Sequence, residues 1–203
     1  MANPDNNFYQ TTEQPSIAEF KDRGSRFIAY AFPISSAEEF KKKLKELKEE
    51  HPKAIHHCFA YRIGNDGNNF RSSDDGEPSG SAGRPILGQI DSKGVTNTAV
   101  IVVRYFGGTL LGVPGLINAY KTATSSALQS SSIVKKPVLV SYRLQFDYTI
   151  LNEVMRIIKK YDCVVLKQDL QLFCMVETAI PRSDSEQCIG QLKNLKSMEL
   201  SAF

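Results

Sequence analysis

Residues Asn97–Phe106, with the sequence NTAVIVVRYF, are the clearest strand in the chain, and the neighbouring segments are interpreted outward from them. The nearly unbroken apolar run predicts burial on both faces, because a strand with one wet face alternates polar and apolar residues. Upstream, residues 83–94 (GRPILGQIDSKG) predict a short helix that begins at Pro85 and ends at Gly94. Downstream, a glycine-rich loop leads into another predicted helix, residues 116–131.

Three further segments belong to the first part of the chain. Residues 26–34 (RFIAYAFPI) and 56–64 (HHCFAYRIG) predict strands, because they are rich in aromatic and β-branched side chains. Residues 35–52 predict a helix, which Ser36 and Glu39 would start as an S-x-x-E capping box. Together with the central strand, these segments predict an α/β or α+β domain built around one sheet.

The pattern changes at residues 131–138 (SSIVKKPV), where a helix end, two lysines and a proline indicate a domain boundary. We therefore expect two domains, residues 1–136 and residues 137–203. In the second, the order strand-helix-strand-strand-helix-strand predicts the ferredoxin-like arrangement, with a four-stranded antiparallel sheet and two helices on one face. Its second helix is predicted to start with another capping box, Ser183 and Glu186.

Composition narrows the class of protein. The 203 residues carry a net charge of +3, which is too small to indicate a nucleic-acid-binding protein by itself. No apolar run approaches the roughly 20 residues of a membrane-spanning helix, and the polar start MANPDNNFYQTTEQ carries no signal-peptide core. The four cysteines are widely scattered, which favours reduced thiols over disulfides or zinc ligands. We expect a cytoplasmic protein without membrane contact.

Two loops hold most of the unusual residues, residues 74–84 (DDGEPSGSAGR) and residues 104–112 (RYFGGTLLG). Each adjoins a predicted helix start, where free backbone N–H groups and the helix dipole favour an anion. Arginine forks can bind phosphate, and aromatic rings beside glycines offer a base a surface on which to stack. The residues that we assign to this predicted nucleic-acid-binding site are Arg71, Arg84, Arg104, Tyr105, Phe106, Gly107 and Gly108. We expect the three arginines to lie near one another and near the glycine pair.

The first of these loops also has a structural interpretation. Its three carboxylates would repel phosphate unless they pair with the same arginines. In that case the loop is a tightly folded corner rather than a binding site, and both alternatives stay open. The residues of this segment, here called the signature loop, are Asp74, Asp75, Gly76, Glu77, Pro78, Gly80 and Gly83.

No familiar catalytic or metal-binding pattern accompanies the loops. The serine-centred G-x-S-x-G elbow and the phosphate-binding pattern G-x-x-x-x-G-K-[ST] are both missing. His56 and His57 are adjacent in a predicted strand, so they point to opposite faces and do not chelate one metal as a pair. We assign no catalytic residue, no metal site and no cofactor, and we do not expect an enzyme, although the sequence does not exclude one.

Residues 70–90 (FRSSDDGEPSGSAGRPILGQI) and residues 97–112 (NTAVIVVRYFGGTLLG), followed by GLINAY, resemble the signature of the Impact/YigZ family. The resemblance implies an N-terminal domain similar to the second domain of a small-subunit ribosomal protein, and a C-terminal ferredoxin-like domain. It also implies a link to translation. Eukaryotic members act in translational control by restraining a starvation-responsive kinase, with an additional N-terminal domain that we do not expect here.

Three hypotheses about function follow. The first is a translation-associated protein, and in particular a regulator of translation, whose partner is RNA or the ribosome. The second is an adaptor that binds a protein, such as a translation-related one, without contacting nucleic acid. The third is an uncharacterised hydrolase. Salt-dependent affinity for RNA separates the first from the others, because phosphate contacts release counterions.

Overall fold

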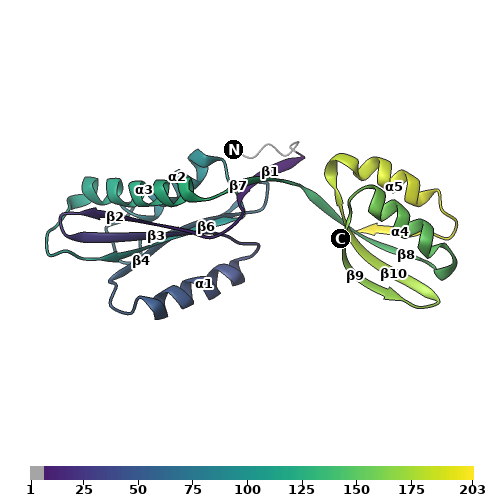
Figure 1. The fold of residues 1–203 in the computed structure, drawn as a ribbon, viewed down its shortest axis with the longest axis horizontal. Coiled ribbons are helices and arrows are strands. Elements are labelled where there is room, and N and C mark those ends of the chain that lie inside the picture. Colours follow the sequence, from purple (N-terminus) through teal and green to yellow (C-terminus); the bar gives the residue numbers. More distant parts are fainter. Residues whose placement is uncertain (1–6) are drawn as a thin grey trace. The chain divides into compact units, whose positions relative to one another are not determined.

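The computed structural model describes residues 7–203, and these residues fold into two compact units. The first is formed by residues 9–136, and the second by residues 137–203 together with residues 7 and 8. Both units mix helices and strands (Figure 1). Over the described residues, no helix has both the length and the apolar character needed to cross a membrane.

A five-stranded sheet forms the centre of the first unit, with the strand order β2-β3-β6-β4-β5. The strands are β2 (Ser16–Asp22), β3 (Ser25–Pro33), β4 (His56–Ile63), β5 (Asn69–Ser73) and β6 (Thr98–Tyr105). Every neighbouring pair in this sheet is antiparallel. β6 is the strand predicted to be buried on both faces, and all of its residues except the last are buried.

Helices cover both faces of this sheet (Figure 1). α1 (Ala37–Glu50) packs on the face that contains Ile101 of β6. α2 (Gly83–Lys93) and α3 (Gly112–Ser130) pack on the opposite face, which contains Val102. An antiparallel sheet usually keeps one wet face. Here neither face is wet, which explains why β6 reads as a continuous apolar run.

The start of α1 and the end of α2 agree with their sequence signals, whereas α2 begins at Gly83, two residues before the predicted start at Pro85. The Ser36 hydroxyl accepts a hydrogen bond from the Glu39 N–H at 3.1 Å, which confirms the predicted N-cap. The Glu39 carboxylate accepts from the Ser35 N–H at 2.8 Å, so the reciprocal bond of the capping box lies one residue earlier than predicted. Gly94 ends α2 in the left-handed conformation, with φ of +65°.

The sequence did not predict the strands β1 (Phe8–Thr12) and β2 of the first part, and a third strand, β7 (Ile133–Pro137), lies where a domain boundary was expected. β1 pairs with β7 in a separate two-stranded sheet, and β2 forms the edge of the main sheet. Most residues of these strands are exposed or half-buried. They therefore lack the apolar run or the clean alternation by which strands are recognised.

The second unit contains four strands and two longer helices. In chain order these are β8 (Leu139–Asp147), α4 (Leu151–Lys160), β9 (Val164–Leu170), β10 (Phe173–Pro181), α5 (Ser185–Lys193) and β11 (Glu199–Ala202). The strands form one antiparallel sheet in the order β11-β8-β10-β9. α4 and α5 lie on the same face of it, over a core that includes Leu144, Val176 and Leu192 (Figure 1).

The capping box predicted for the last helix is wrong. α5 begins at Ser185, and the N-cap residue before it, Asp184, makes no side-chain capping bond. The Ser183 hydroxyl instead donates to the Asp184 carboxylate at 2.8 Å. The motif has the right spacing, but a 3-10 turn over Arg182–Asp184 delays the start of the helix beyond it.

Gly107, two residues after the end of β6, lies against the turn between β2 and β3. A Cβ atom on Gly107 would lie 1.9 Å from the carbonyl carbon of Gly24 and 2.2 Å from the backbone nitrogen of Ser25. The Gly107 N–H donates to the Ser25 hydroxyl at 3.1 Å. Gly108 differs, because its φ of +85° requires glycine while no atom lies within 4 Å of its Cβ position.

We predict that Gly107→Ala destabilises the first unit by about 3 kcal/mol, because two backbones must separate to admit one methyl group. Gly108→Ala meets only the strain of a left-handed alanine and is expected to lower the free energy of unfolding by about 1 kcal/mol. Urea unfolding followed by circular dichroism measures both. Equal effects of the two substitutions would contradict the close approach.

Candidate functional site

The signature loop and the glycine turn lie at the same end of the five-stranded sheet. β5 and β6 both run antiparallel to β4, so the segments that follow them leave the sheet at the end where β4 begins. Hydrogen bonds from both segments meet at this end.

Asp74 closes the signature loop onto the start of α2. One carboxylate oxygen accepts from the Gly80 N–H at 2.8 Å, and the other accepts from the N–H groups of Ala82 and Gly83 at 3.0 and 2.8 Å. Burial raises the pKa of Asp74, but these three donors outweigh it and the net shift is downward. The amides that were predicted to attract an outside anion are therefore occupied by the loop's own carboxylate.

Gly83 is required by the same closure. A Cβ atom there would lie 2.7 Å from the backbone nitrogen of Ser73 and 2.9 Å from its carbonyl carbon. The start of α2 can approach the end of β5 only because residue 83 has no side chain. This glycine is explained by packing against the backbone rather than by a ligand.

Asp75 fastens the loop to the first residues of β4. Its carboxylate accepts from the His57 backbone N–H at 2.7 Å, and its carbonyl oxygen accepts from Nδ1 of His56 at 2.8 Å. The ammonium group of Lys48, on α1, lies 3.9 Å from the same carboxylate. Asp75 thus orders the loop by hydrogen bonds to the backbone and to one imidazole.

Glu77 is the residue of the loop whose side chain is buried in the interior, where it is only 3% exposed. Its Oε1 atom accepts from Nη1 of Arg104 at 2.6 Å and from the Tyr120 hydroxyl at 2.7 Å. Its Oε2 atom lies 3.9 Å from Nε2 of His56. A buried carboxylate needs such partners, because the loss of hydration is otherwise uncompensated. This carboxylate therefore connects the loop with β4, β6 and α3.

Tyr120 and Cys58 extend this polar cluster, and neither was assigned to it from the sequence. The Cys58 thiol lies 2.9 Å from the Asp74 carbonyl oxygen and 3.3 Å from the Tyr120 hydroxyl. Burial raises the pKa of both groups well above their usual ranges, so both stay protonated at neutral pH. The sequence places both residues on buried faces, but periodicity does not reveal polar partners that are 43 and 62 positions away.

Arg104 is committed to this cluster and is only 5% exposed. Its guanidinium pairs with Glu77 and lies over the rings of Phe27 and Phe106, with centroids 5.3 and 5.7 Å away. The expectation that Arg104 offers a fork to phosphate is therefore wrong, because that fork is already used inside the fold.

The expected cluster of three arginines does not form. Arg71 lies opposite Tyr61, which lies opposite Ala99, whereas Arg104 is five positions further along β6. At about 3.3 Å per residue this separates the two arginines by roughly 17 Å along the strands alone. Tyr61 belongs to the core under α1, so Arg71 is on the α1 side of the sheet. The exposed Arg84 lies in the first turn of α2, on the other side.

The two aromatic residues after Arg104 have different roles. The Tyr105 hydroxyl hydrogen-bonds with Nδ1 of His51 at 2.8 Å, and the Arg26 guanidinium lies 5.7 Å from its ring centroid, so Tyr105 helps to hold the end of α1. Phe106 is 43% exposed. It leads into the exposed residues Gly107 and Gly108, and of the predicted aromatic pair it is the one whose ring remains accessible.

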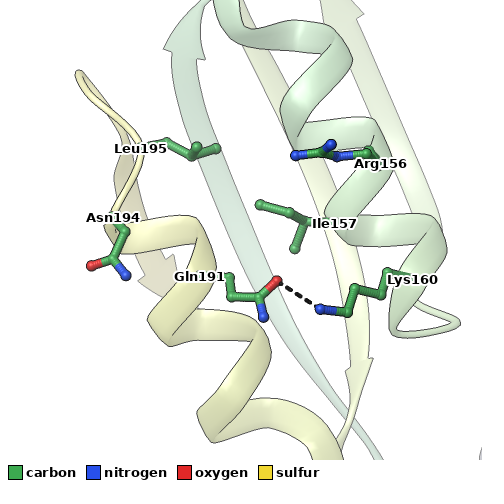
Figure 2. Close-up of a pocket in the computed structure, with 6 residues that line it drawn as sticks. All are labelled: Arg156, Ile157, Lys160, Gln191, Asn194 and Leu195. Carbon is green, nitrogen blue, oxygen red and sulfur yellow. Dashed lines mark hydrogen bonds between the residues drawn. The ribbon is translucent and has the colours of Figure 1, made fainter.

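A second candidate site is a hollow of about 470 Å³ between α4 and α5 (Figure 2). Arg156 and Lys160 project into it from α4, one helical turn apart, and Ile157 lies between them. Lys160 donates to the Gln191 side-chain oxygen at 3.3 Å. The residues that line the hollow are Arg156, Ile157, Lys160, Gln191, Asn194 and Leu195. With two cations and no acid in this lining, the hollow favours an anion.

No cluster of three or more metal-ligating side chains is found among residues 7–203. The functional side chains of the loop end are hydrogen-bonded to one another, and they supply no deprotonated nucleophile at Cys58 or Tyr120.

Comparison with known proteins identifies the family of this chain. The first unit carries an Impact N-terminal domain, which matches residues 23–128. The chain belongs to the IMPACT family. It is 36% identical over 183 residues to the IMPACT family member YigZ of Escherichia coli (strain K12), covering 88% of this chain and 90% of YigZ. It is 34% identical over 146 residues to the IMPACT family member YvyE of Bacillus subtilis (strain 168), covering 72% of this chain and 67% of YvyE.

A solved structure resembles the whole chain. A crystal structure of a hypothetical protein superposes with a TM-score of 0.79 at 31% sequence identity, covering 97% of this chain and 98% of that one. The likeness therefore includes both units.

We predict that Glu77→Gln lowers the free energy of unfolding by about 3 kcal/mol, because it leaves the buried Arg104 guanidinium without a counter-charge. The matched control is Arg143→Ala, which breaks the exposed Arg143–Glu177 pair (2.8 Å) and is expected to lower that free energy by at most about 1 kcal/mol. Urea unfolding of both variants makes the comparison. Similar losses would mean that burial adds nothing to the Glu77–Arg104 pair.

The lowered pKa of Asp74 predicts a pH dependence. The folded-state pKa lies below the unfolded value of about 4, so the stabilisation is present above pH 4 and is lost as the pH falls through the folded pKa. In Asp74→Asn the amide nitrogen faces backbone donors, which should cost about 1–3 kcal/mol at neutral pH. The gap in melting temperature between wild type and Asp74→Asn should stay constant near neutral pH and narrow as the pH falls below about 4. A gap that stays constant below pH 4 would contradict this assignment.

Proposed function

We propose that the protein is a translation-associated factor of the cytoplasm that regulates translation by binding RNA or the ribosome. One observation carries the proposal: every carboxylate of the signature loop is hydrogen-bonded within the fold. Asp74 binds three backbone amides, Asp75 binds the start of β4, and Glu77 binds Arg104 and Tyr120. The objection that these acids repel phosphate is thereby much reduced, because their charge is offset by donors.

The start of α3 supports contact with an anion. This helix has 19 residues, no acidic residue in its first turn and no side-chain capping bond, and Gly112, Val113 and Pro114 at its start are exposed. Pro114 has no N–H, but the first-turn amides of Gly112 and Val113 and the helix dipole favour a phosphate at such an end. Phe106 lies shortly before it in the chain, and its exposed ring suits stacking with a base.

Family membership supports the link to translation, because the resemblance implies that eukaryotic members act in translational control. We also propose that the first unit resembles the second domain of a small-subunit ribosomal protein and that the second unit is ferredoxin-like. The antiparallel order β11-β8-β10-β9 with both helices on one face favours the latter. The hollow with Arg156 and Lys160 would add phosphate contacts from the second unit.

A protein-binding adaptor is the second candidate, and exposed apolar side chains favour it. Leu110 is 81% exposed, Val113 46% and Ile117 38%, and all three lie in the glycine-rich loop or the first turns of α3. Contiguous exposed apolar side chains usually mark contact with a protein. Such a contact would depend weakly on salt, whereas phosphate contacts weaken steeply as salt rises.

Co-sedimentation with ribosomes, together with titration of single-stranded RNA, at two salt concentrations tests the proposal. Phe106→Ala should weaken RNA binding about tenfold, because stacking contributes roughly 1–3 kcal/mol per base. Arg84→Ala should weaken binding across RNA sequences alike and reduce the salt slope by about one unit. Arg71→Ala is the matched control, since Arg71 is exposed but lies on the α1 side of the sheet.

Three outcomes have distinct meanings. Loss of binding in Phe106→Ala and Arg84→Ala, with Arg71→Ala unchanged, supports the proposed surface. Ribosome binding that resists salt and is lost in Leu110→Ser supports the adaptor. No binding to ribosomes or RNA at low salt would overturn the RNA-binding proposal.

A further inference from the structure

The outer edge of β9 is exposed along its whole length. β9 is the last strand in the order β11-β8-β10-β9, so its second edge has no neighbour in the sheet. All seven residues of Val164–Leu170 are exposed, including Val164 (47%), Leu166 (52%) and Leu170 (40%). An open edge presents unpaired N–H and C=O groups, and proteins normally protect such edges. The opposite edge, β11, has only four residues.

Two features limit how this edge can pair. The register of β9 against β10 shifts between Glu177 and Thr178, so Leu166 is an extra, bulged residue. Lys167 then places a charge in the exposed strand. After the bulge, residues 167–170 follow β10 without interruption. The bulge and the charge therefore disfavour pairing of this edge with most other strands, but residues 167–170 remain a regular strand that can still pair.

That segment is complementary to itself when it is paired antiparallel about Gln168. In this register Lys167 of one chain lies opposite Asp169 of the other, and the second Lys167–Asp169 pair follows by symmetry. Gln168 lies opposite its own copy at the two-fold axis. Both flanking oppositions join unlike charges, a pairing that stabilises neighbouring strands.

The faces of the sheet agree with this register. Leu170 and Gln168 lie opposite Cys174 and Val176, which belong to the core under the helices. Lys167 and Asp169 lie opposite Glu177 and Met175, on the other side. Both Lys167–Asp169 pairs therefore lie on the face away from the helices, within the regular part of the strand that follows the bulge at Leu166.

We propose that β9 is a self-association surface, on which a second copy of this chain adds its own β9 antiparallel about Gln168. The two four-stranded sheets then become one continuous sheet through a two-fold axis. This surface is independent of the proposed function in translation. A single strand pair buries less area than the roughly 1,200 Å² of standard interfaces, so the dimer should form only at high protein concentration.

Charge reversal tests the register. Sedimentation velocity of the full chain over a roughly hundredfold concentration range should reveal a rising fraction of dimer. Lys167→Asp creates two Asp–Asp oppositions, and Asp169→Lys creates two Lys–Lys oppositions, so each should weaken the dimer about tenfold. The double variant Lys167→Asp/Asp169→Lys restores both pairs with exchanged signs and should recover the wild-type dimer.

Because both positions are exposed, thermal melts should verify that all variants are folded. A chain that stays monomeric throughout the concentration range would falsify the proposal. A dimer that is unaffected by either single reversal uses another surface and equally overturns it. Loss in both single variants without recovery in the double variant rejects the pairing about Gln168.

Discussion

The buried pair of Glu77 and Arg104 is the interaction on which the first unit depends. Its short contact of 2.6 Å joins the signature loop to the end of the central strand, and Tyr120 adds a bond from α3. Charges in an apolar interior are tolerated only when they are paired, so removal of Glu77 or Arg104 leaves the other charge uncompensated. The cluster thus ties the loop, the sheet and a helix into a single arrangement, which also fixes where Phe106 and the glycine turn lie.

These hydrogen bonds distinguish a structural loop from an accessible surface, which the sequence alone could not distinguish. The signature loop is a tightly folded structural corner, because all three of its carboxylates have hydrogen-bond partners inside the fold. Its neighbour, the segment after Arg104, remains exposed from Phe106 to Leu110. The many glycines, carboxylates and aromatic residues of these two segments therefore have two roles. Those of the signature loop hold the fold together, and those of the segment after Arg104 form an accessible surface.

Much of the fold could be predicted from local pattern. The central strand, the two strands around residues 26–34 and 56–64, and the serine cap of α1 follow from apolar runs, β-branched side chains and one hydrogen-bonding motif. Exposed strands such as β1 carry no such pattern and were missed.

The site was less predictable, because it depends on strand register rather than on composition. The antiparallel pairing with β4 puts Arg71 on the α1 side and Arg104 in the interior, and no local signal distinguishes one arginine from the other. The partners of Glu77 likewise lie 27 and 43 positions away.

These separations also set an order of events during synthesis. Asp74 and Gly83 are nine positions apart, so the loop can close on itself as soon as the start of α2 has left the ribosome. Glu77 must wait until residue 120 has emerged before its carboxylate can be buried with both donors. Until then the Glu77 carboxylate of the nascent chain stays hydrated, and the first unit cannot complete its core before α3 is made.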